Sequence, residues 1–459
     1  MERTIRLPDG GWAVSPARTK NAVWELWNRI QSLIASQLGQ SVAWIVIGSG
    51  FSQGGSFLSS VVVARVLGKE TFGQFALIQS TVTALTSLAG LGLGLTATKY
   101  ISEFRAKRPE NIGKLLGFSS ILVGLAGFCF SIASWVLAPK MAVHANDVGI
   151  VRGLRLSAPS VFFLTLTGYQ LGTLAGFEAF RFIGQVGVLF GLAALIVSWL
   201  GAVGFGLPGA VVAQDIAAVL LFSLYGIGVH RECRRSGIAV QYRGVWNQRS
   251  ILSRVSIPAT MSGTVCSLAI WGTNTILAKT CGYSQLALFI AAYNLRSIVI
   301  FVPALISRVA APRLNFLFAA GDLSRYARAF WATVRANGLL AMLTAFLAFL
   351  GAHRFMLLFG KEFGGSSWLL ALILGSAVVE VTSNNLYIAL MASCKFWRNL
   401  AVMSLWTAVL ACTSALTTMR LGASGLAIAY LAAWSVSAAV FAAEARGQTL
   451  RQEVYGHNT

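Results

Sequence analysis

The stretch FIGQVGVLFGLAALIVSWLGA, at residues 182–202, contains no charged side chain and is continuously apolar. About 20 predominantly apolar residues are enough for a helix to cross the hydrocarbon core of a bilayer. A strand of a membrane β-barrel would instead alternate apolar and polar positions. The stretch therefore predicts a transmembrane α-helix, and its glycine and alanine residues are typical of helices that pack closely in a membrane.

The rest of the chain has the same character. Hydrophobic residues make up 56% of its 459 residues, charged residues only 11%, and the mean hydropathy is +0.70. Because soluble domains carry about 25% charged residues, this composition predicts an all-α polytopic membrane protein. We expect about twelve transmembrane helices, at residues 44–66, 71–96, 114–138, 156–176, 182–202, 207–229, 256–279, 285–309, 331–351, 366–392, 399–419 and 424–443.

A basic segment at residues 230–255 separates these spans into two sets of six. ARVLG at 64–68 matches AKTCG at 278–282, and AGFEAFR at 175–181 matches MASCKFW at 391–397, at offsets of 214 and 216. These matches favour a duplication with both copies in one orientation; chance similarity between glycine-rich helices is the alternative. The expected organisation is a basic cytoplasmic tail with an interfacial amphipathic helix (1–43), an N-terminal lobe (44–229), a linker (230–255), a C-terminal lobe (256–443) and a cytoplasmic tail (444–459).

The net charge of +21 is explained by topology rather than by nucleic-acid binding. Lys and Arg gather in the cytoplasmic loops of membrane proteins. If the N-terminus is cytoplasmic, 26 of the 36 basic residues lie in cytoplasmic segments and nine lie outside. This asymmetry predicts a multi-pass protein of the bacterial plasma (inner) membrane with both termini cytoplasmic. Arg65, one of the nine, is expected to extend its guanidinium to the outer surface.

No catalytic motif of the GxSxG, HExxH or P-loop type occurs in the sequence. The six cysteines form no CxxC or Cys/His cluster, so neither a cofactor nor a metal is expected. The longest outside loops are short for an enzyme that must hold a sugar. A membrane glycan polymerase or ligase stays an alternative, and it would depend on an outside residue such as Arg152, Arg155 or His353.

Arg296 lies near the middle of the eighth span, where a charge costs about 2.5–3.5 kcal/mol on insertion scales. Such a residue usually faces a cavity or an oppositely charged partner. Glu380 in the tenth span and Asp215 in the sixth could each be that partner, or a site for a coupling proton or sodium ion. Asn384 continues the polar face of Glu380 one turn later. The sequence leaves open which acid is used, and whether Arg296 lines a cavity or forms a structural pair.

Polar stripes run along the first helix of each half. Ser49, Gln53 and Ser56 share a face of the first span, and Ser267 and Asn274 share a face of the seventh. Matching stripes predict a water-lined central cavity; the alternative is that these side chains satisfy the backbones of neighbouring helices. With the eighth span included, the expected substrate-cavity residues are Arg296, Asn294, Ser307, Ser49, Gln53, Ser56, Ser267 and Asn274.

Glycine spacing predicts two further features. Gly168, Gly172 and Gly176 recur every fourth residue on the fourth span, which indicates a face for close helix packing. Gly90, Gly92 and Gly94, near the end of the second span, indicate a bend.

Two segments of the N-terminal half resemble a known family: VARVLGKETFGQF at 63–75 and GLGLGLTATKYISEFR at 90–105, with weaker similarity in AGFEAF at 175–180 and LFGKEF at 358–363. They are similar to bacterial polysaccharide and oligosaccharide transporters, the O-antigen-type flippases of the multidrug/oligosaccharidyl-lipid/polysaccharide superfamily. The resemblance implies two six-helix lobes around a central cavity that opens alternately to each side. It also implies an oligosaccharide on an undecaprenyl pyrophosphate carrier as cargo, and it assigns no individual residue.

The leading hypothesis is therefore a flippase rather than an enzyme. It would move a lipid-linked oligosaccharide from the cytoplasmic to the outer leaflet in surface polysaccharide biosynthesis, with membrane lipids as partners and no nucleic acid. A guanidinium in the cavity would offset the lost hydration of a pyrophosphate. Whether H⁺ or Na⁺ is coupled stays open. The alternative in the same superfamily is an ion-coupled multidrug exporter, which would depend on Asp215 or Glu380 rather than on Arg296.

Overall fold

The computed structural model describes residues 37–107, 110–241, 257–319, 322–392 and 396–456, and within these ranges every regular element is a helix. Eight of the described helices are long and apolar enough to cross a membrane, or ten if each of two bent pairs is one span. The all-α membrane fold is confirmed, whereas the total of twelve spans stays a prediction. The interfacial helix expected within residues 1–36 lies outside the described residues.

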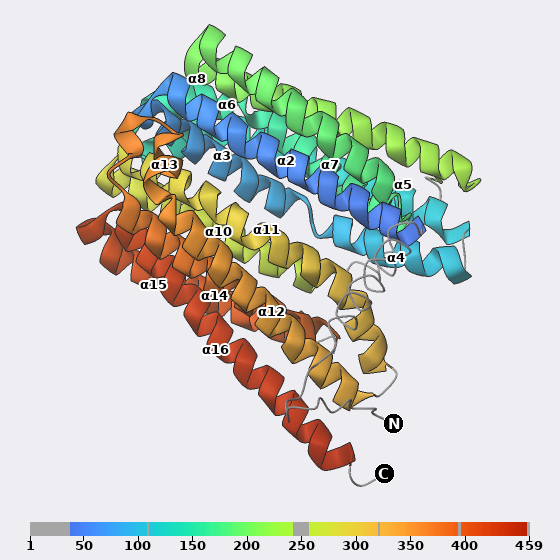
Figure 1. The fold of residues 1–459 in the computed structure, drawn as a ribbon. Coiled ribbons are helices and arrows are strands. Elements are labelled where there is room, and N and C mark those ends of the chain that lie inside the picture. Colours follow the sequence, from blue (N-terminus) through green and yellow to red (C-terminus); the bar gives the residue numbers. More distant parts are fainter. Residues whose placement is uncertain (1–36, 108–109, 242–256, 320–321, 393–395, 457–459) are drawn as a thin grey trace, which may run out of the picture.

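The helices form two lobes that lie side by side (Figure 1). The lobes meet at the end of the molecule where α13 lies, which we call the α13 end, and diverge toward the end where α2 begins and α16 ends, which we call the terminal end. The N-terminal lobe contains α2 (Gln37–Leu67), α3 (Lys69–Ala89), α4 (Leu93–Lys107), α5 (Glu110–His144), η1 (Val148–Ile150), α6 (Val151–Leu156), α7 (Ala158–Gly176) and α8 (Phe180–Arg235). The C-terminal lobe contains α10 (Ile257–Cys281), α11 (Tyr283–Ala319), α12 (Leu323–Leu350), α13 (Ala352–Leu357), η4 (Lys361–Phe363), α14 (Ser367–Ala392), α15 (Phe396–Leu421) and α16 (Ala423–Gly456).

Helix α8 is a hairpin of two antiparallel segments. Its 56 residues would measure about 84 Å if straight, far more than the roughly 30 Å of a bilayer core. Gly206 breaks the helix with φ 61° and ψ −138°, a conformation that side chains rarely adopt. Across the turn, Gly201 and Gly209 lie so close that a Cβ on either would overlap the carbonyl oxygen of the other. The hairpin corresponds to the two spans expected at 182–202 and 207–229.

The second expected span, 71–96, is not one straight helix. Leu91 and Gly92 have φ angles of 47° and 61°, and α3 and α4 meet there at 45°. The bend indicated by the glycines is confirmed. Much of the expected loop at 97–114 is helical, because α4 continues to Lys107 and α5 begins at Glu110.

Other expected loops and tails are also shorter than the sequence indicated. The loop near 139–155 contains the end of α5, η1 and most of α6, and the loop near 352–365 contains α13 and η4. The first seven residues of α2 fall within the expected tail at 1–43, and α16 extends through most of the expected tail at 444–459. The helices therefore continue beyond the predicted spans, because hydropathy locates the membrane-embedded part of a helix and not its polar ends; the span and domain bounds themselves stay predictions.

Glycine contacts bring helix backbones together inside the N-terminal lobe. Gly48 and Gly55 of α2 face Gly184 and Gly191 of α8, and a Cβ on any of the four would overlap backbone of the opposite helix. In a bilayer such close approach supplies the dispersion contacts that hold helices together.

The ridge expected on the fourth span makes the same kind of contact. Gly172 of α7 packs directly on Gly94 of α4, and Gly176 lies against Ile101. The prediction of close packing at this ridge is confirmed.

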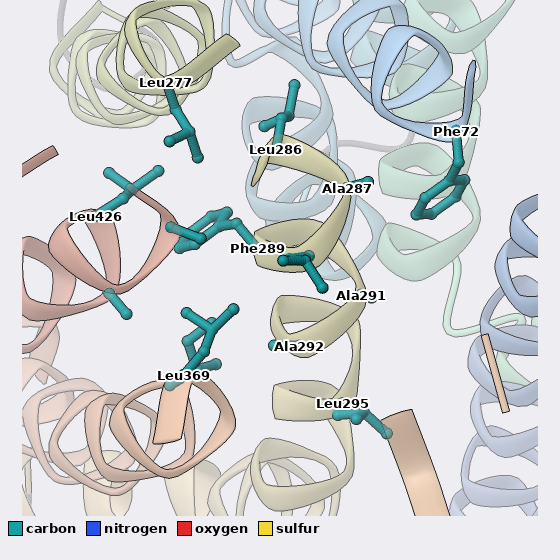
Figure 2. Close-up of a cluster of buried hydrophobic side chains, with 14 of the residues drawn as sticks. Phe72, Leu277, Leu286, Ala287, Phe289, Ala291, Ala292, Leu295, Leu369 and Leu426 are labelled. Atoms are coloured by element: carbon teal, nitrogen blue, oxygen red, sulfur yellow. The ribbon is translucent and has the colours of Figure 1, made fainter. Parts of the chain in front are cut away.

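Helix α11 occupies the centre of the largest buried hydrophobic cluster (Figure 2). Phe289 and its neighbours on α11 pack against Leu277 of α10, Leu369 of α14 and Leu426 of α16, all in the C-terminal lobe. The cluster continues to Phe72 of α3, in the N-terminal lobe. Helix α11 is therefore the element through which the apolar core of one lobe reaches the other.

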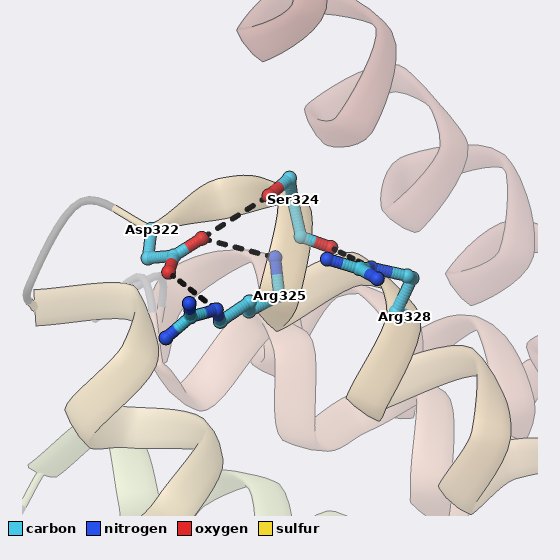
Figure 3. Close-up of polar contacts among 4 residues, drawn as sticks. All are labelled: Asp322, Ser324, Arg325 and Arg328. Carbon is cyan, nitrogen blue, oxygen red and sulfur yellow. Dashed lines mark hydrogen bonds and ion pairs between the residues drawn. The ribbon is translucent and has the colours of Figure 1, made fainter. Parts of the chain in front are cut away.

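At the terminal end, Asp322 caps α12 (Figure 3). Its Oδ1 accepts hydrogen bonds from the backbone N–H of Arg325 at 3.1 Å and from the hydroxyl of Ser324 at 3.2 Å, and its Oδ2 lies 3.3 Å from Nε of Arg325. The backbone hydrogen bond is the main reason that the pKa of Asp322 is lowered. The cap satisfies an N–H that the first helical turn leaves free.

The α2–α8 contact can be tested with adjacent glycines. Gly55→Ala should lower the stability of the folded protein by about 1–3 kcal/mol, because the new methyl group would overlap the backbone of Gly191. Gly54→Ala is the matched control, since a Cβ there meets nothing within 4 Å. Thermal unfolding followed by fluorescence-detected size-exclusion chromatography measures both. Equal midpoints for the two variants would contradict the proposed packing.

Candidate functional site: a polar cavity and a buried ion pair beside α11

A cavity of about 360 Å³ lies in the N-terminal lobe against α11 of the other lobe. Helices α2, α3, α7 and α8 form most of its wall, and Asn294 and Ser297 of α11 complete it. Its lining is rich in hydroxyl and amide groups: Ser52, Gln53, Ser56, Ser59, Ser60, Gln79, Ser198, Gln214, Asn294 and Ser297. The Oγ of Ser59 and Oε1 of Gln214 are buried without a hydrogen-bond partner in the described residues. The cavity can therefore offer hydrogen bonds to a polar ligand.

Three of the residues expected from the sequence line this cavity. Gln53 and Ser56 are exposed on α2, and Asn294 donates a 2.8 Å hydrogen bond from Nδ2 to Oγ of Ser60. That bond links α11 to α2 and so joins the two lobes. Ser49, one turn before Gln53, is partly buried and is not part of the lining.

The stripe expected on the seventh span has different roles. Oγ of Ser267 lies 2.9 Å from Oγ of Ser87, so this pair joins α10 to α3 across the lobes. Asn274 is 2% exposed, and its Oδ1 has no hydrogen-bond partner among the described residues. Neither residue lines the 360 Å³ cavity, and their place along a shared central passage stays a prediction.

The sequence reasoning missed Gln79, Ser198 and Gln214 of the cavity. Gln79 comes from α3, and the other two come from the two arms of the α8 hairpin. Each is a polar residue inside an apolar run, which is a usable signal. Their common orientation, however, depends on how the hairpin packs.

Arg296 of α11 forms an ion pair with Glu380 of α14, through Nη1 and Oε2. Both side chains are largely buried, at 15% and 10% exposure. The guanidinium also lies over the ring of Tyr293, 4.0 Å from its centroid. Its Nε is buried with no hydrogen-bond partner in the described residues, so the pair leaves one donor of the guanidinium unused.

Arg296 is not among the residues that line the cavity. Its side chain is held on the C-terminal-lobe side of α11, where the ring of Tyr430 lies 5.6 Å from Tyr293 and 6.0 Å from Trp406. Ser297, the next residue along the chain, does line the cavity. The ion pair therefore lies beside the cavity rather than in its wall.

The other acid, Asp215, is on the second arm of the α8 hairpin. Its Oδ1 accepts hydrogen bonds from the hydroxyl and the backbone N–H of Ser160. No Lys or Arg of the described residues forms an ion pair with it. Glu380, not Asp215, is thus the partner of Arg296, and Asn384, one turn beyond Glu380, is exposed.

Ser307 belongs to a polar network within the C-terminal lobe. Its hydroxyl donates to Oδ1 of Asn385 at 2.8 Å, and Nδ2 of Asn337 contacts that same Oδ1 at 2.8 Å and the Ser307 hydroxyl at 2.9 Å. Asn337 is 0% exposed. The network joins α11, α12 and α14, so Ser307 does not line the cavity described above.

Polar and aromatic contacts hold the lobes together at the α13 end. Nε of Arg65, an exposed residue, donates to the carbonyl oxygen of Leu358 at 2.6 Å, and the expectation that its guanidinium reaches the outer surface stays a prediction. The ring of Phe359 packs on Phe57 and Phe72, with centroids 5.8 and 6.3 Å apart. Carbonyl groups at a helix C-terminus carry partial negative charge, so a guanidinium is well placed there.

A second set of contacts joins α3 to α10 deeper in the fold. Nε1 of Trp271 donates to Oγ1 of Thr81 at 3.0 Å, and Oγ1 of Thr264 donates to the carbonyl of Ser87 at 3.3 Å. Between the lobes, these bonds are few and individually modest. They add to the apolar contacts of Phe72 and its neighbours with α11.

The three residues considered for a catalytic site outside the membrane do not lie together in one place. Arg152 and Arg155 are on α6 of the N-terminal lobe, whereas His353 is on α13 of the other lobe and contacts the carbonyl of Gly364 at 3.0 Å. The described part of the chain holds no group of three or more His, Cys, Asp or Glu side chains that could bind a metal ion.

Known proteins resemble the chain in sequence and in fold. Residues 38–317 match a family described as polysaccharide biosynthesis protein. The EPS I polysaccharide export inner membrane protein EpsE of Ralstonia nicotianae (strain ATCC BAA-1114 / GMI1000) is 24% identical over 409 residues, which cover 86% of this chain and 88% of the relative.

Among solved structures, an inward-facing multidrug resistance MATE family transporter of the MOP superfamily matches with a TM-score of 0.75 and 14% identity, over 90% of this chain and 99% of that chain. An outward-facing MATE family transporter matches with a TM-score of 0.68 and 16% identity, over 90% and 96% of the two chains. At these identities the matches show a common fold.

Loss of the Arg65 contact should change the distance between the two lobes at the α13 end. Arg65→Ala should broaden the distance between spin labels placed at residues 70 and 362, one on each lobe at the α13 end, because the bonds to the α13 carbonyls are lost. Pulsed electron paramagnetic resonance on a variant without the six native cysteines measures that distance.

Lys69→Ala is the control for this experiment, since Lys69 is a neighbouring cation for which the structure shows no bond to the other lobe. The same narrow distance distribution in Arg65→Ala and in the control would show that Arg65 does not hold the lobes together.

Proposed function

Because the chain belongs to the family of polysaccharide biosynthesis proteins and has the fold of MOP-superfamily transporters, we propose that it is a flippase for lipid-linked oligosaccharides. It would carry an undecaprenyl pyrophosphate-linked glycan from the cytoplasmic to the outer leaflet of the inner membrane by alternating access. Both termini would be cytoplasmic. The relative named as a polysaccharide export inner membrane protein supports this direction and this membrane.

The arrangement of the lobes supports entry of cargo from the cytoplasmic side. The lobes are bonded at the α13 end and diverge toward the termini (Figure 1). The TM-score is higher with the inward-facing structure than with the outward-facing one, 0.75 against 0.68. If the bonds at the α13 end were broken and the lobes closed together at the terminal end, the cavity would open to the outer side of the membrane.

The observation that carries the proposal is the buried Arg296–Glu380 pair beside the polar cavity. A pyrophosphate that leaves water needs a cation, and a guanidinium meets that need with two parallel hydrogen bonds. In the pair, the charge of Arg296 is balanced when no cargo is bound, and its Nε has no hydrogen-bond partner among the residues that the structure describes. The Arg296 side chain would turn from Glu380 toward the adjacent cavity to meet the cargo phosphate, and Glu380 would take up a proton so that no unpaired carboxylate is left buried.

A paired substitution separates this role from a structural one. Arg296→Ala alone would leave the Glu380 carboxylate buried and unpaired, which costs about 3–5 kcal/mol. Arg296→Met combined with Glu380→Gln removes both charges at similar volume. This double variant should insert and purify like the wild type and lose transport of lipid-linked glycan, while Arg296→Lys should keep part of the activity because it retains the charge.

The control for this experiment is a second interhelical pair of the same lobe. Arg398 and Glu444 are 2.7 Å apart and more exposed, and Arg398→Met with Glu444→Gln should leave transport unchanged. Transport is followed as translocation of a fluorescent lipid-linked glycan in proteoliposomes. Wild-type transport by the Arg296/Glu380 double variant would refute the role assigned to the guanidinium.

Gene deletion tests the cargo itself. Without the protein, undecaprenyl-linked repeat units should accumulate on the cytoplasmic face, because their synthesis continues while their exit is blocked. Accessibility of the glycan to an externally added lectin, compared with total lipid-linked glycan by mass spectrometry, measures this. Unchanged intermediates together with new sensitivity to drugs would instead favour a multidrug exporter.

A specific observation keeps the exporter as the second candidate. Asp215 is a partly buried acid of the N-terminal lobe with Ser160 as its bonded neighbour and no ion-pair partner among the described residues. Such an acid can take up and release a proton during transport. If the protein is an ion-coupled exporter, Asp215→Asn should abolish drug efflux while Arg296→Lys leaves it intact; if it is a flippase, neither variant should change drug sensitivity.

A further inference from the structure

Two adjoining hollows lie on the N-terminal lobe at the α13 end, and they share Arg152 and Leu156 of α6. The first, of about 400 Å³, is lined otherwise by Trp135, Arg155 and the backbone around Gly149. The second, of about 820 Å³, runs along the α8 hairpin, and apart from Arg152 its lining is apolar: Leu156, Val197, Leu200, Gly201, Phe205, Pro208, Gly209, Val212, Ala213 and Ile216. Together they form one amphipathic groove with cations at one end.

The groove and the 360 Å³ polar cavity beside α11 lie on opposite faces of the α8 hairpin. Ser198 and Gln214 line the cavity, whereas their neighbours Val197 and Ala213 line the groove. The two sites share no lining residue. Phe205, 79% exposed, stands at the hairpin turn and lines the groove.

The two arginines are positioned to hold an anion. Arg152 and Arg155 are three residues apart on α6, so they lie on one side of the helix. Both are exposed, and neither forms an ion pair with a carboxylate of the described residues. The guanidinium of Arg155 rests on the ring of Trp135, 4.9 Å from its centroid, which holds it beside the groove.

The position of Arg152 and Arg155 in the chain also favours an anion-binding role. Basic residues are sparse in the segments expected outside, with nine of 36 there. Two unpaired arginines on one short helix are thus an exception to the charge asymmetry of this protein. A phosphate group would balance them, and it forms strong charge-assisted hydrogen bonds with guanidinium groups.

We propose that α6 and the α8 hairpin bind an anionic phospholipid of the bilayer. Its phosphate lies between Arg152 and Arg155, at the depth where tryptophan side chains gather at membrane interfaces. One acyl chain lies in the apolar groove against Leu200, Val212 and Ile216. Because the groove is separate from the polar cavity beside α11, the occupant is a resident phospholipid of the membrane and not the cargo.

Native mass spectrometry of the purified protein tests the proposal without any transport assay. In detergent containing equal amounts of phosphatidylglycerol and phosphatidylethanolamine, the wild type should retain phosphatidylglycerol preferentially. Arg152→Ala combined with Arg155→Ala should weaken phosphatidylglycerol binding by about tenfold or more, because each basic residue near a membrane surface contributes on the order of a kcal/mol. Binding of phosphatidylethanolamine should not change.

Two further variants make the test specific. Lys140→Ala with Arg420→Ala removes two other exposed cations expected on the same side, and should leave the preference intact. Val212→Trp fills the apolar groove without a change of charge, and should also weaken phosphatidylglycerol binding. Each variant is first shown to elute from size exclusion as the wild type does.

Equal retention of the two phospholipids by the wild type would overturn the proposal, as would wild-type binding by the double arginine variant. Displacement of phosphatidylglycerol by a polyprenyl diphosphate at equal concentration would also overturn it, because the groove would then be a cargo site.

Discussion

A guanidinium inside the hydrocarbon core of a membrane needs an anionic partner, and here that need determines how α11 faces α14. Arg296 pairs with Glu380 and rests on the ring of Tyr293, so this face of α11 is committed to the C-terminal lobe. Phe289 and its apolar neighbours add the hydrophobic contacts that hold the helix there. The adjacent face, with Asn294 and Ser297, is then left for the cavity and for α2.

The protein uses different interactions within a lobe and between lobes. Within the N-terminal lobe, glycines bring backbones into direct contact, and such contacts lose their dispersion energy if the helices separate by even a small distance. Between the lobes the described contacts are of several kinds: buried apolar side chains such as Phe72 against the α11 core, one glycine contact of Gly73 with the backbone of Tyr283, and polar contacts such as Arg65 on the carbonyl of Leu358. Two lobes that are each held by close backbone packing could move as rigid bodies about a central cavity.

Polar residues inside the spans serve two purposes in this fold. Some face the cavity, as Gln53 and Ser56 do, whereas others complete buried networks, as Ser307 does with Asn337 and Asn385. Both kinds avoid the cost of an unsatisfied polar group in a membrane. Their sequence patterns are alike, since in either case a polar side chain interrupts an apolar run, so only the neighbours in space tell a binding surface from a structural contact.

From the sequence alone, the membrane class, the all-helical fold, the bend at Gly90–Gly92 and the glycine ridge on α7 could be predicted. These features depend on local composition and spacing, because a bilayer forces each long apolar run into a helix that satisfies its own backbone. Helix ends were less accurate, because hydropathy detects only the membrane-embedded part of α4, α5 and α16. The choice of Glu380 over Asp215, the contact of Arg65 with α13 and the joining of Gln79, Ser198 and Gln214 into one cavity wall were decided only by tertiary structure. Each depends on which faces of helices distant in sequence meet, and a one-dimensional pattern shows which face of a helix is polar but not which neighbour it meets.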